Sequence, residues 1–181
     1  MRIYWNNQVD VLRGGRVDVA FVHLPIHDDG IETLHVRSEP RMASWPSTIG
    51  PPGKPKISIR ELADDPVIIQ RGATPGWRAY HNVDPRPDGR HPRRGPEVDN
   101  LEEKLEHVAA GRAISFVPAS VAAAVSHGGV VYLPVTDIPP IQIDLAWPAN
   151  HPSPLVAGFA NAVIQTHPKR RVWQPLPQNP A

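Results

Sequence analysis

Several polar side chains stand where short apolar runs give way to predicted helices, and their residue types suit the binding of a small anion. Ser120 can begin a helix, Thr74 lies in the turn before another, and Arg71 and His23 could add positive charge. The free N–H groups and the positive dipole end of a helix favour an anion at its N-terminus. Plain structural roles stay open for the same residues, since Ser and Thr often only cap a helix and an arginine in a turn is often only exposed.

Residues suited to catalysis or metal binding are sparse. The chain has no cysteine, which excludes disulfides, thiolate zinc sites and cysteine nucleophiles. It has no serine in a nucleophile elbow, no glycine-rich phosphate loop with lysine and no His-Glu-x-x-His pattern. His23 and His27 are four residues apart, but Pro25 between them argues against a helix, so we interpret them as a solvated pair. The sequence therefore predicts no metal site and no cofactor.

Residues 97–135 organise the elements that must position these side chains. Short apolar runs alternate there with helical runs, a β-α-β-α-β pattern typical of a parallel sheet. Asn100 is predicted to cap the first helix with Glu103 at capping-box spacing, and Gly111 is predicted to end it in a left-handed conformation. Ser120 is predicted to cap the next helix, which Gly128 would end. In such a sheet, ligands bind beyond the carboxyl ends of the strands.

The rest of the chain supplies further short elements. Apolar periodicity and capping signals predict helices at residues 8–13, 58–63, 77–83 and 155–166. In the last helix Val156, Phe159, Ala160 and Val163 are predicted to face inward. Extended runs predict strands or extended segments at residues 2–5, 17–24, 31–46, 67–70 and 141–147.

Composition narrows the class of protein. The 181 residues suffice for one ordinary domain or two small lobes, and 19 Lys+Arg balance 18 Asp+Glu. Such a balance disfavours a nucleic-acid-binding domain, and the arginine-rich run at 86–94 has no interleaved aromatic residue, which favours a solvated loop. No apolar run could span a bilayer and no signal peptide is evident, so we expect a cytoplasmic protein without membrane contact.

Six segments in fixed order resemble the effector-binding domain of LysR-type transcriptional regulators. They are residues 12–22 (LRGGRVDVAFV), 38–41 (SEPR), 59–64 (IRELAD), 108–118 (VAAGRAISFVP), 135–140 (VTDIPP) and 145–147 (LAW). No single segment is diagnostic, but together they stay in register over residues 12–159.

The resemblance implies a type II periplasmic-binding-protein-like α/β fold, with two Rossmann-like lobes joined by two crossing strands. We expect lobe I at residues 1–65 plus 147–167, lobe II at 66–146, and a flexible Pro-rich tail at 168–181. Compared with the family pattern, the first strand and helix of lobe I are missing, and so is the winged helix-turn-helix domain. Contact with DNA is therefore expected only through a domain that this chain does not contain.

The resemblance also implies a small-molecule effector in the cleft between the lobes, which we expect to be a carboxylate or another small anion. The predicted effector-binding residues are His23, Leu24, Pro25, Arg71, Thr74, Asn100, Val117, Pro118, Ala119 and Ser120. The effector would shift the relative populations of lobe arrangements and so change how subunits pack. By the same resemblance, residues 8–13 of one subunit would contact residues 101–110 of another in a homodimer or larger homo-oligomer.

Two other functions fit the same fold. An enzyme acting on a small anionic substrate would need a titratable group in the cleft, and the sequence offers only His23 and Asp99. A solute-binding protein is disfavoured because no export signal is present. We therefore predict a ligand-sensing regulatory domain without catalytic residues.

Overall fold

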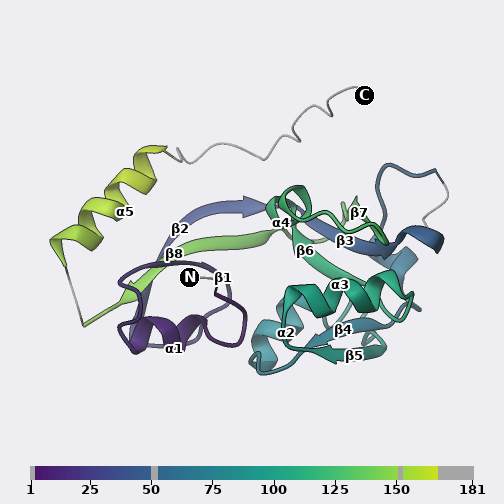
Figure 1. Ribbon diagram of the computed structural model, residues 1–181, viewed down its shortest axis with the longest axis horizontal. Helices are drawn as coiled ribbons and strands as arrows, with labels where there is room; N and C mark the ends of the chain where they lie inside the picture. Colours follow the sequence, from purple (N-terminus) through teal and green to yellow (C-terminus); the bar gives the residue numbers. More distant parts are fainter. Residues whose placement is uncertain (1–2, 50–52, 151–152, 167–181) are drawn as a thin grey trace.

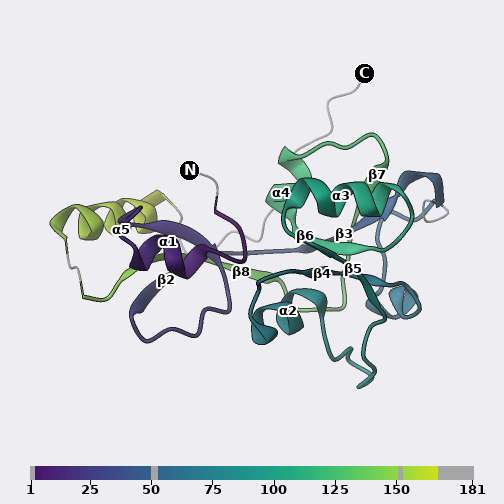
Figure 2. The ribbon, with the colours of Figure 1, turned by 60° about the horizontal axis from the view of Figure 1, so that its bottom comes forward.

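The computed structural model describes residues 3–49, 53–150 and 153–166. The elements gather into two bodies side by side (Figures 1 and 2). One contains α1 (Gln8–Arg13), β1 (Ala20–His23), β2 (Ile31–Glu39), β8 (Ile141–Pro148) and α5 (Pro154–Thr166), and the other contains the elements from β3 to β7. This is the predicted two-lobe α/β architecture.

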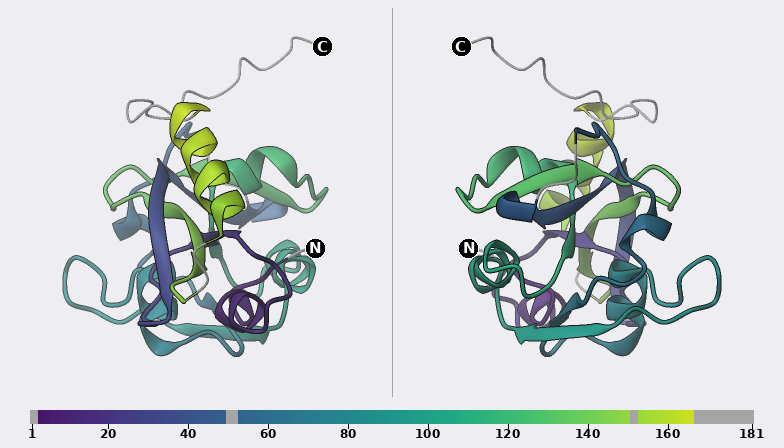
Figure 3. Two further views of the ribbon diagram at one scale, coloured as in Figure 1. Left: turned by 90° about the vertical axis from the view of Figure 1, so that its left-hand side faces the viewer. Right: turned by 90° about the vertical axis from the view of Figure 1, so that its right-hand side faces the viewer.

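The first lobe is built on a three-stranded sheet with the order β1-β8-β2. The central strand β8 pairs antiparallel with both neighbours, with Phe21 opposite Leu145 on one side and Leu34 opposite Leu145 on the other. Adjacent residues of β8 point to opposite faces. Leu145 packs against α5, and Ala146 packs in the cluster that contains Leu12 of α1. The helices α5 and α1 therefore cover opposite faces of this sheet (Figures 1 and 3).

The second lobe is built on a mixed sheet. The strand β3 (Arg41–Pro46) pairs antiparallel with both β6 (Ser115–Pro118) and β7 (Val130–Pro134), which makes β6 and β7 parallel to each other. The strand β4 (Val67–Gln70) pairs parallel with β5 (Arg94–Val98), and a bridge from Val67 to Ile114 links β4 to the start of β6. The predicted strand-helix-strand order of residues 97–135 is thus correct, with antiparallel β3 inserted between its last two strands.

The chain changes from one sheet to the other at two places. Pro40 separates β2 from β3, and residues 135–140 separate β7 from β8. These changes of sheet lie elsewhere than the predicted lobe boundaries at 65/66 and 146/147, because residues 41–46 pair within the second sheet and residues 141–146 pair within the first. The predicted tail at 168–181 lies outside the described residues.

Short helices cover the second sheet, and three of them begin at side-chain caps. The helix α2 (Pro75–Asn82) is capped by the Thr74 side chain, and α3 (Leu101–Ala109) by Asn100. A 3₁₀ turn, η2 (Ile59–Leu62), begins with the predicted capping box of Ser58 and Glu61. A second 3₁₀ turn, η1 (Ser47–Ile49), and the helix α4 (Ala119–Ala124) complete the set.

Four sequence-based expectations are wrong. No strand forms in the described part of residues 2–5, because the first sheet offers that segment no neighbouring strand. Glu103 accepts a hydrogen bond from the N–H of Asp99, in place of the Asn100 N–H expected of a capping box. Ser120 lies inside α4, which Pro118 precedes and which ends at Ala124, before Gly128. Phe159 is 45% exposed, since only Val156, Ala160 and Val163 of α5 are buried.

Candidate functional site

The loops after β4 and β5 lie side by side at the carboxyl end of the second sheet. Gln70 and Val98, the last residues of the two strands, are paired, and the Arg71 N–H donates to the Val98 carbonyl (2.9 Å). The exposed Arg71 guanidinium forms ion pairs with Asp99 (2.6 Å) and Glu97 (3.5 Å). Thr74 and Asn100 begin α2 and α3 directly after these loops. The structure therefore brings together three predicted site residues, Arg71, Thr74 and Asn100.

The end of β1 and the residue after it contact α2 near both of its ends. Trp77 donates from its indole N–H to the His23 carbonyl (3.2 Å), and the His81 ring nitrogen Nε2 lies 2.9 Å from the Leu24 carbonyl. On the other side of β1, the Gln8 side chain accepts from the His23 N–H (2.9 Å). His23, Leu24 and Pro25, the predicted contacts from the first lobe, thus face the helix whose start is capped by Thr74.

The segment 3–7 also reaches the second lobe. The Trp5 indole N–H donates to the Arg71 carbonyl (3.0 Å), and the Trp5 ring lies 6.2 Å from the ring of Trp77. A Cβ built on Gly72 would lie 3.0 Å from Asn6 Cβ, so this segment packs closely on the loop after β4. No local sequence pattern indicates this contact, and residues 2–5 were predicted to be a strand or extended segment.

One partly buried histidine, His23, and one buried histidine, His81, line the contact between the lobes. Burial lowers the pKa of His23 to about 4, and the Glu39 carboxylate opposes this change only in part. Burial, together with the nearby His23 and Arg41, lowers the pKa of His81 well below its usual range. The His81 ring stacks on Trp77 with 3.6 Å between centroids. Both imidazoles are therefore neutral at pH 7, and they present flat, weakly polar faces.

The start of α4 already binds a carboxylate of the same chain. Glu39, which is 1% exposed, accepts from the Ser120 N–H (2.7 Å) and from the Arg37 Nε–H (2.6 Å). The Ala119 N–H donates to the Pro40 carbonyl (3.1 Å). Glu39 connects this segment to the site, because its carboxylate accepts from Ser120 and its charge raises the pKa of His23. The other predicted residues of this segment are Val117, Pro118 and Ala119.

Lys104 is a charged residue of this region that the sequence analysis did not identify. It lies in α3, is 4% exposed, and its ammonium lies 5.1 Å from the centre of the Trp5 ring. Burial lowers the pKa of Lys104 to about 8. The sequence does contain a signal for this burial. Lys104 stands on the same side of the helical period as Leu105 and Val108, which face inward.

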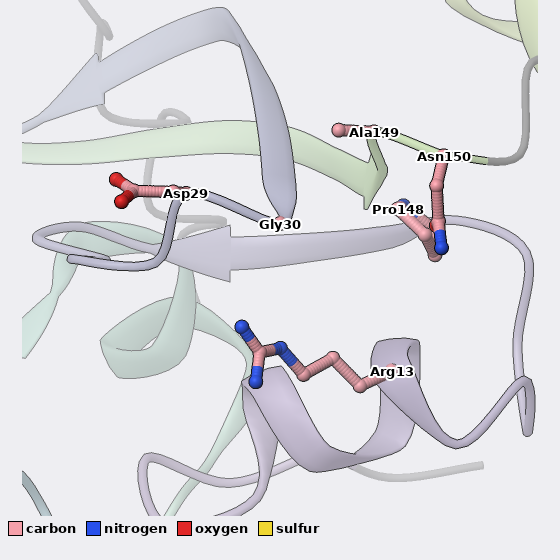
Figure 4. Close-up of a pocket in the computed structure, with 6 residues that line it drawn as sticks. All are labelled: Arg13, Asp29, Gly30, Pro148, Ala149 and Asn150. Atoms are coloured by element: carbon pink, nitrogen blue, oxygen red, sulfur yellow. The ribbon is translucent and has the colours of Figure 1, made fainter.

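Two hollows lie away from this region, in the first lobe. One, of about 540 Å³, is lined by residues of α1, of the turn before β2 and of the end of β8 (Figure 4), namely Arg13, Asp29, Gly30, Pro148, Ala149 and Asn150. The other, of about 440 Å³, lies between Trp147 and α5. Neither is lined by a predicted site residue. In the described part of the chain, no group of three or more His, Cys, Asp or Glu residues is placed to hold a metal ion.

The two lobes and their crossings can be compared with known proteins. Residues 3–168 match the sequence profile of the LysR substrate binding domain. The chain belongs to this family. It is an effector-binding domain of the LysR type, a class found in transcriptional regulators. No curated protein sequence matches the chain.

Solved structures of the family have the same fold. The effector-binding domain of a BenM variant superposes with a TM-score of 0.71 at 22% identity, covering 87% of this chain and 74% of that one. CbnR in complex with target DNA gives 0.75 at 20%, covering 93% and 59%. The reduced OxyR regulatory domain from Pseudomonas aeruginosa gives 0.62 at 22%, covering 87% and 77%. The chain spans between 54% and 59% of the full-length BenM and CbnR chains.

None of the helices within residues 3–49, 53–150 and 153–166 is long and apolar enough to cross a membrane.

Proposed function

We propose that this domain senses a small carboxylate held between its lobes, where His23, Leu24 and Pro25 face Arg71, Thr74 and Asn100. The observation that carries the proposal is the contact of His23 with Trp77 in the first turn of α2 and of Leu24 with His81 near its end. It places the end of a first-lobe strand against α2, and α3 begins after the neighbouring loop. Val117, Pro118, Ala119 and Ser120 would complete the site from the side of Glu39.

An anionic ligand suits the electrostatics of this region. The two helices that begin here have eight and nine residues, and their N-terminal dipoles favour negative charge. Arg71 and Lys104 add positive charge, whereas His23 and His81 are neutral at pH 7. A relative, the BenM effector-binding domain, has been solved with its effector benzoate at 23% identity to this chain. That relationship supports a carboxylate as the class of ligand.

The response to the ligand would be regulatory. We propose that the lobes divide where the sheets exchange partners, at Pro40 and within residues 135–140, and that the ligand changes their relative position. In a homodimer, α1 of one subunit would pack against α3 of the other and transmit this change. In a cytoplasmic regulator of this kind, a separate winged helix-turn-helix domain would contact DNA.

Calorimetric titration with a panel of aromatic and aliphatic carboxylates tests the proposal. Arg71→Ala should weaken the binding of any carboxylate that the wild type binds by about tenfold, the equivalent of one charge-assisted hydrogen bond of about 1.4 kcal/mol. Arg94→Ala is the matched control, because Arg94 is also exposed and also pairs with Glu97 (3.5 Å) but lies at the other end of β5. It should leave the affinity unchanged.

Absence of binding by every carboxylate in the panel would refute the sensor. Equal losses in the two arginine variants would show that the ligand binds away from the loop after β4. Sedimentation of the wild type with and without the bound carboxylate would test the proposed change in subunit packing.

A further inference from the structure

Lys104 carries a buried positive charge that nothing in the described part of the chain neutralises. Its side chain is 4% exposed and forms no ion pair or hydrogen bond with a described residue. Burial is the cause of its lowered pKa, with no carboxylate opposing it. Burying an ammonium without a counter-charge is unfavourable, so a lysine here has a cost to folding that packing alone does not explain.

The Trp5 side chain is what covers this charge. The ammonium lies 5.1 Å from the centre of the indole ring, a cation–π distance. Trp5 is only partly buried, and it is held by its hydrogen bond to the Arg71 carbonyl and by packing against the cluster that contains Leu105 and Val108. The partly exposed indole therefore screens Lys104 as a neutral substitute for an anion.

The surroundings of Trp5 favour a flat ring in its place. Trp5 lies 6.2 Å from the ring of Trp77, Trp77 stacks on His81 at 3.6 Å, and His81 lies 5.9 Å from His23. These aromatic side chains form a continuous wall beside the ammonium. A group that replaced the indole would regain its contacts only if it were itself planar and apolar.

We propose that Lys104 binds the carboxylate of a planar aromatic acid, and that Trp5 is a cover which this ligand displaces. The inference rests on the proposed function and specifies its ligand and its anchor. Displacement of Trp5 breaks the contact of segment 3–7 with the second lobe. That segment runs directly into α1, so the ligand acts on the helix that we assign to the subunit contact.

Benzoate and cyclohexanecarboxylate, titrated against the full 181-residue chain by calorimetry, test this assignment. Lys104→Met keeps an unbranched side chain that is one atom shorter and removes its charge. It should weaken benzoate binding at least tenfold and raise the melting temperature, because an unpaired buried charge is gone. Trp5→Ala removes the cover and should strengthen benzoate binding severalfold. Lys56→Met, at an exposed lysine, is the matched control and should change neither quantity.

Each outcome supports or overturns one part of the proposal. Unchanged benzoate affinity in Lys104→Met, or a lower melting temperature, would overturn the anchor while carboxylate binding by the wild type still stands. Tighter binding of cyclohexanecarboxylate than of benzoate would overturn the planar ligand. Weaker binding by Trp5→Ala would make Trp5 a wall of the site and overturn its role as a cover. Failure of every carboxylate to bind the wild type would instead refute the proposed function, and this inference with it.

Discussion

At the scale of single residues, Glu39 shows how the chain can satisfy its own anion-binding groups. The sequence places Ala119 and Ser120 where helix N–H groups could bind an external anion. In the structure, the Glu39 carboxylate accepts from Ser120 and pairs with Arg37. A carboxylate that is 1% exposed is stable only because it has these partners.

Replacing Glu39 should therefore destabilise the fold. Glu39→Ala leaves the Ser120 N–H without an acceptor and should lower the free energy of unfolding by about 2 kcal/mol. Glu39→Gln keeps an acceptor and should cost less. Glu97→Ala, which removes a carboxylate that is 49% exposed, is the control, and urea unfolding measures all three. A loss in Glu39→Ala no larger than in Glu97→Ala would contradict this role.

At the scale of elements, the end of α3 depends on the backbone conformation of Gly111. This residue has a φ of +68°, a left-handed conformation that a side chain disfavours. A Cβ built there would lie 3.4 Å from Ile49, an ordinary contact, so space is not the limitation. The glycine is required by conformation alone, as the sequence predicted.

Gly111→Ala should lower the free energy of unfolding by about 1 kcal/mol, because the alanine must adopt a left-handed conformation. Gly128→Ala provides a control, since Gly128 has no positive φ and a Cβ there would meet no atom within 4 Å. That variant should change stability by less than about 0.5 kcal/mol. Thermal or urea unfolding distinguishes the two, and similar losses would argue against the conformational explanation.

At the scale of the whole molecule, the lobes meet through neutral histidines, which makes the assembly sensitive to acid. His23 has its pKa lowered to about 4 in the folded chain, while in the unfolded chain it returns to about 6.5. The unfolded state therefore binds more protons between these values, and stability falls as the pH drops through this range. His81, whose pKa is also lowered, acts in the same direction.

Stability should fall from about pH 7 towards pH 4, with His23 alone costing on the order of 3 kcal/mol by pH 4. Above about pH 8 it should rise again, because burial lowers the pKa of Lys104 to about 8 in the folded chain and the unfolded chain then binds more protons. Urea unfolding at a series of pH values measures the decline. The double variant His23→Gln, His81→Gln should lose most of this pH dependence, although its stability at pH 7 is lower. An unchanged slope in the double variant would place the acid-sensitive groups elsewhere.

Several elements could be predicted from local signals alone. The Asn100 cap, the left-handed Gly111 and the strand at residues 67–70 follow from short-range patterns, and the structure contains each of them. The Thr74 cap was not predicted, since the pattern begins that helix at Trp77. The family and the two-lobe fold were also within reach, because six segments kept their order and spacing. These features depend on residues a few positions apart, or on the order and spacing of short segments along the chain.

Which distant residues meet could not be predicted from the sequence and became clear from the folded chain. The pairing of β3 with β6 and β7, the carboxylate of Glu39 at α4, and the cover of Trp5 over Lys104 join residues far apart in the chain. No local pattern encodes such contacts, since they arise when whole elements bury their apolar faces together. The burial of Lys104 is the clearest case. A lysine in a helix is ordinarily predicted to be exposed, and this one is covered by a tryptophan about a hundred positions earlier in the chain.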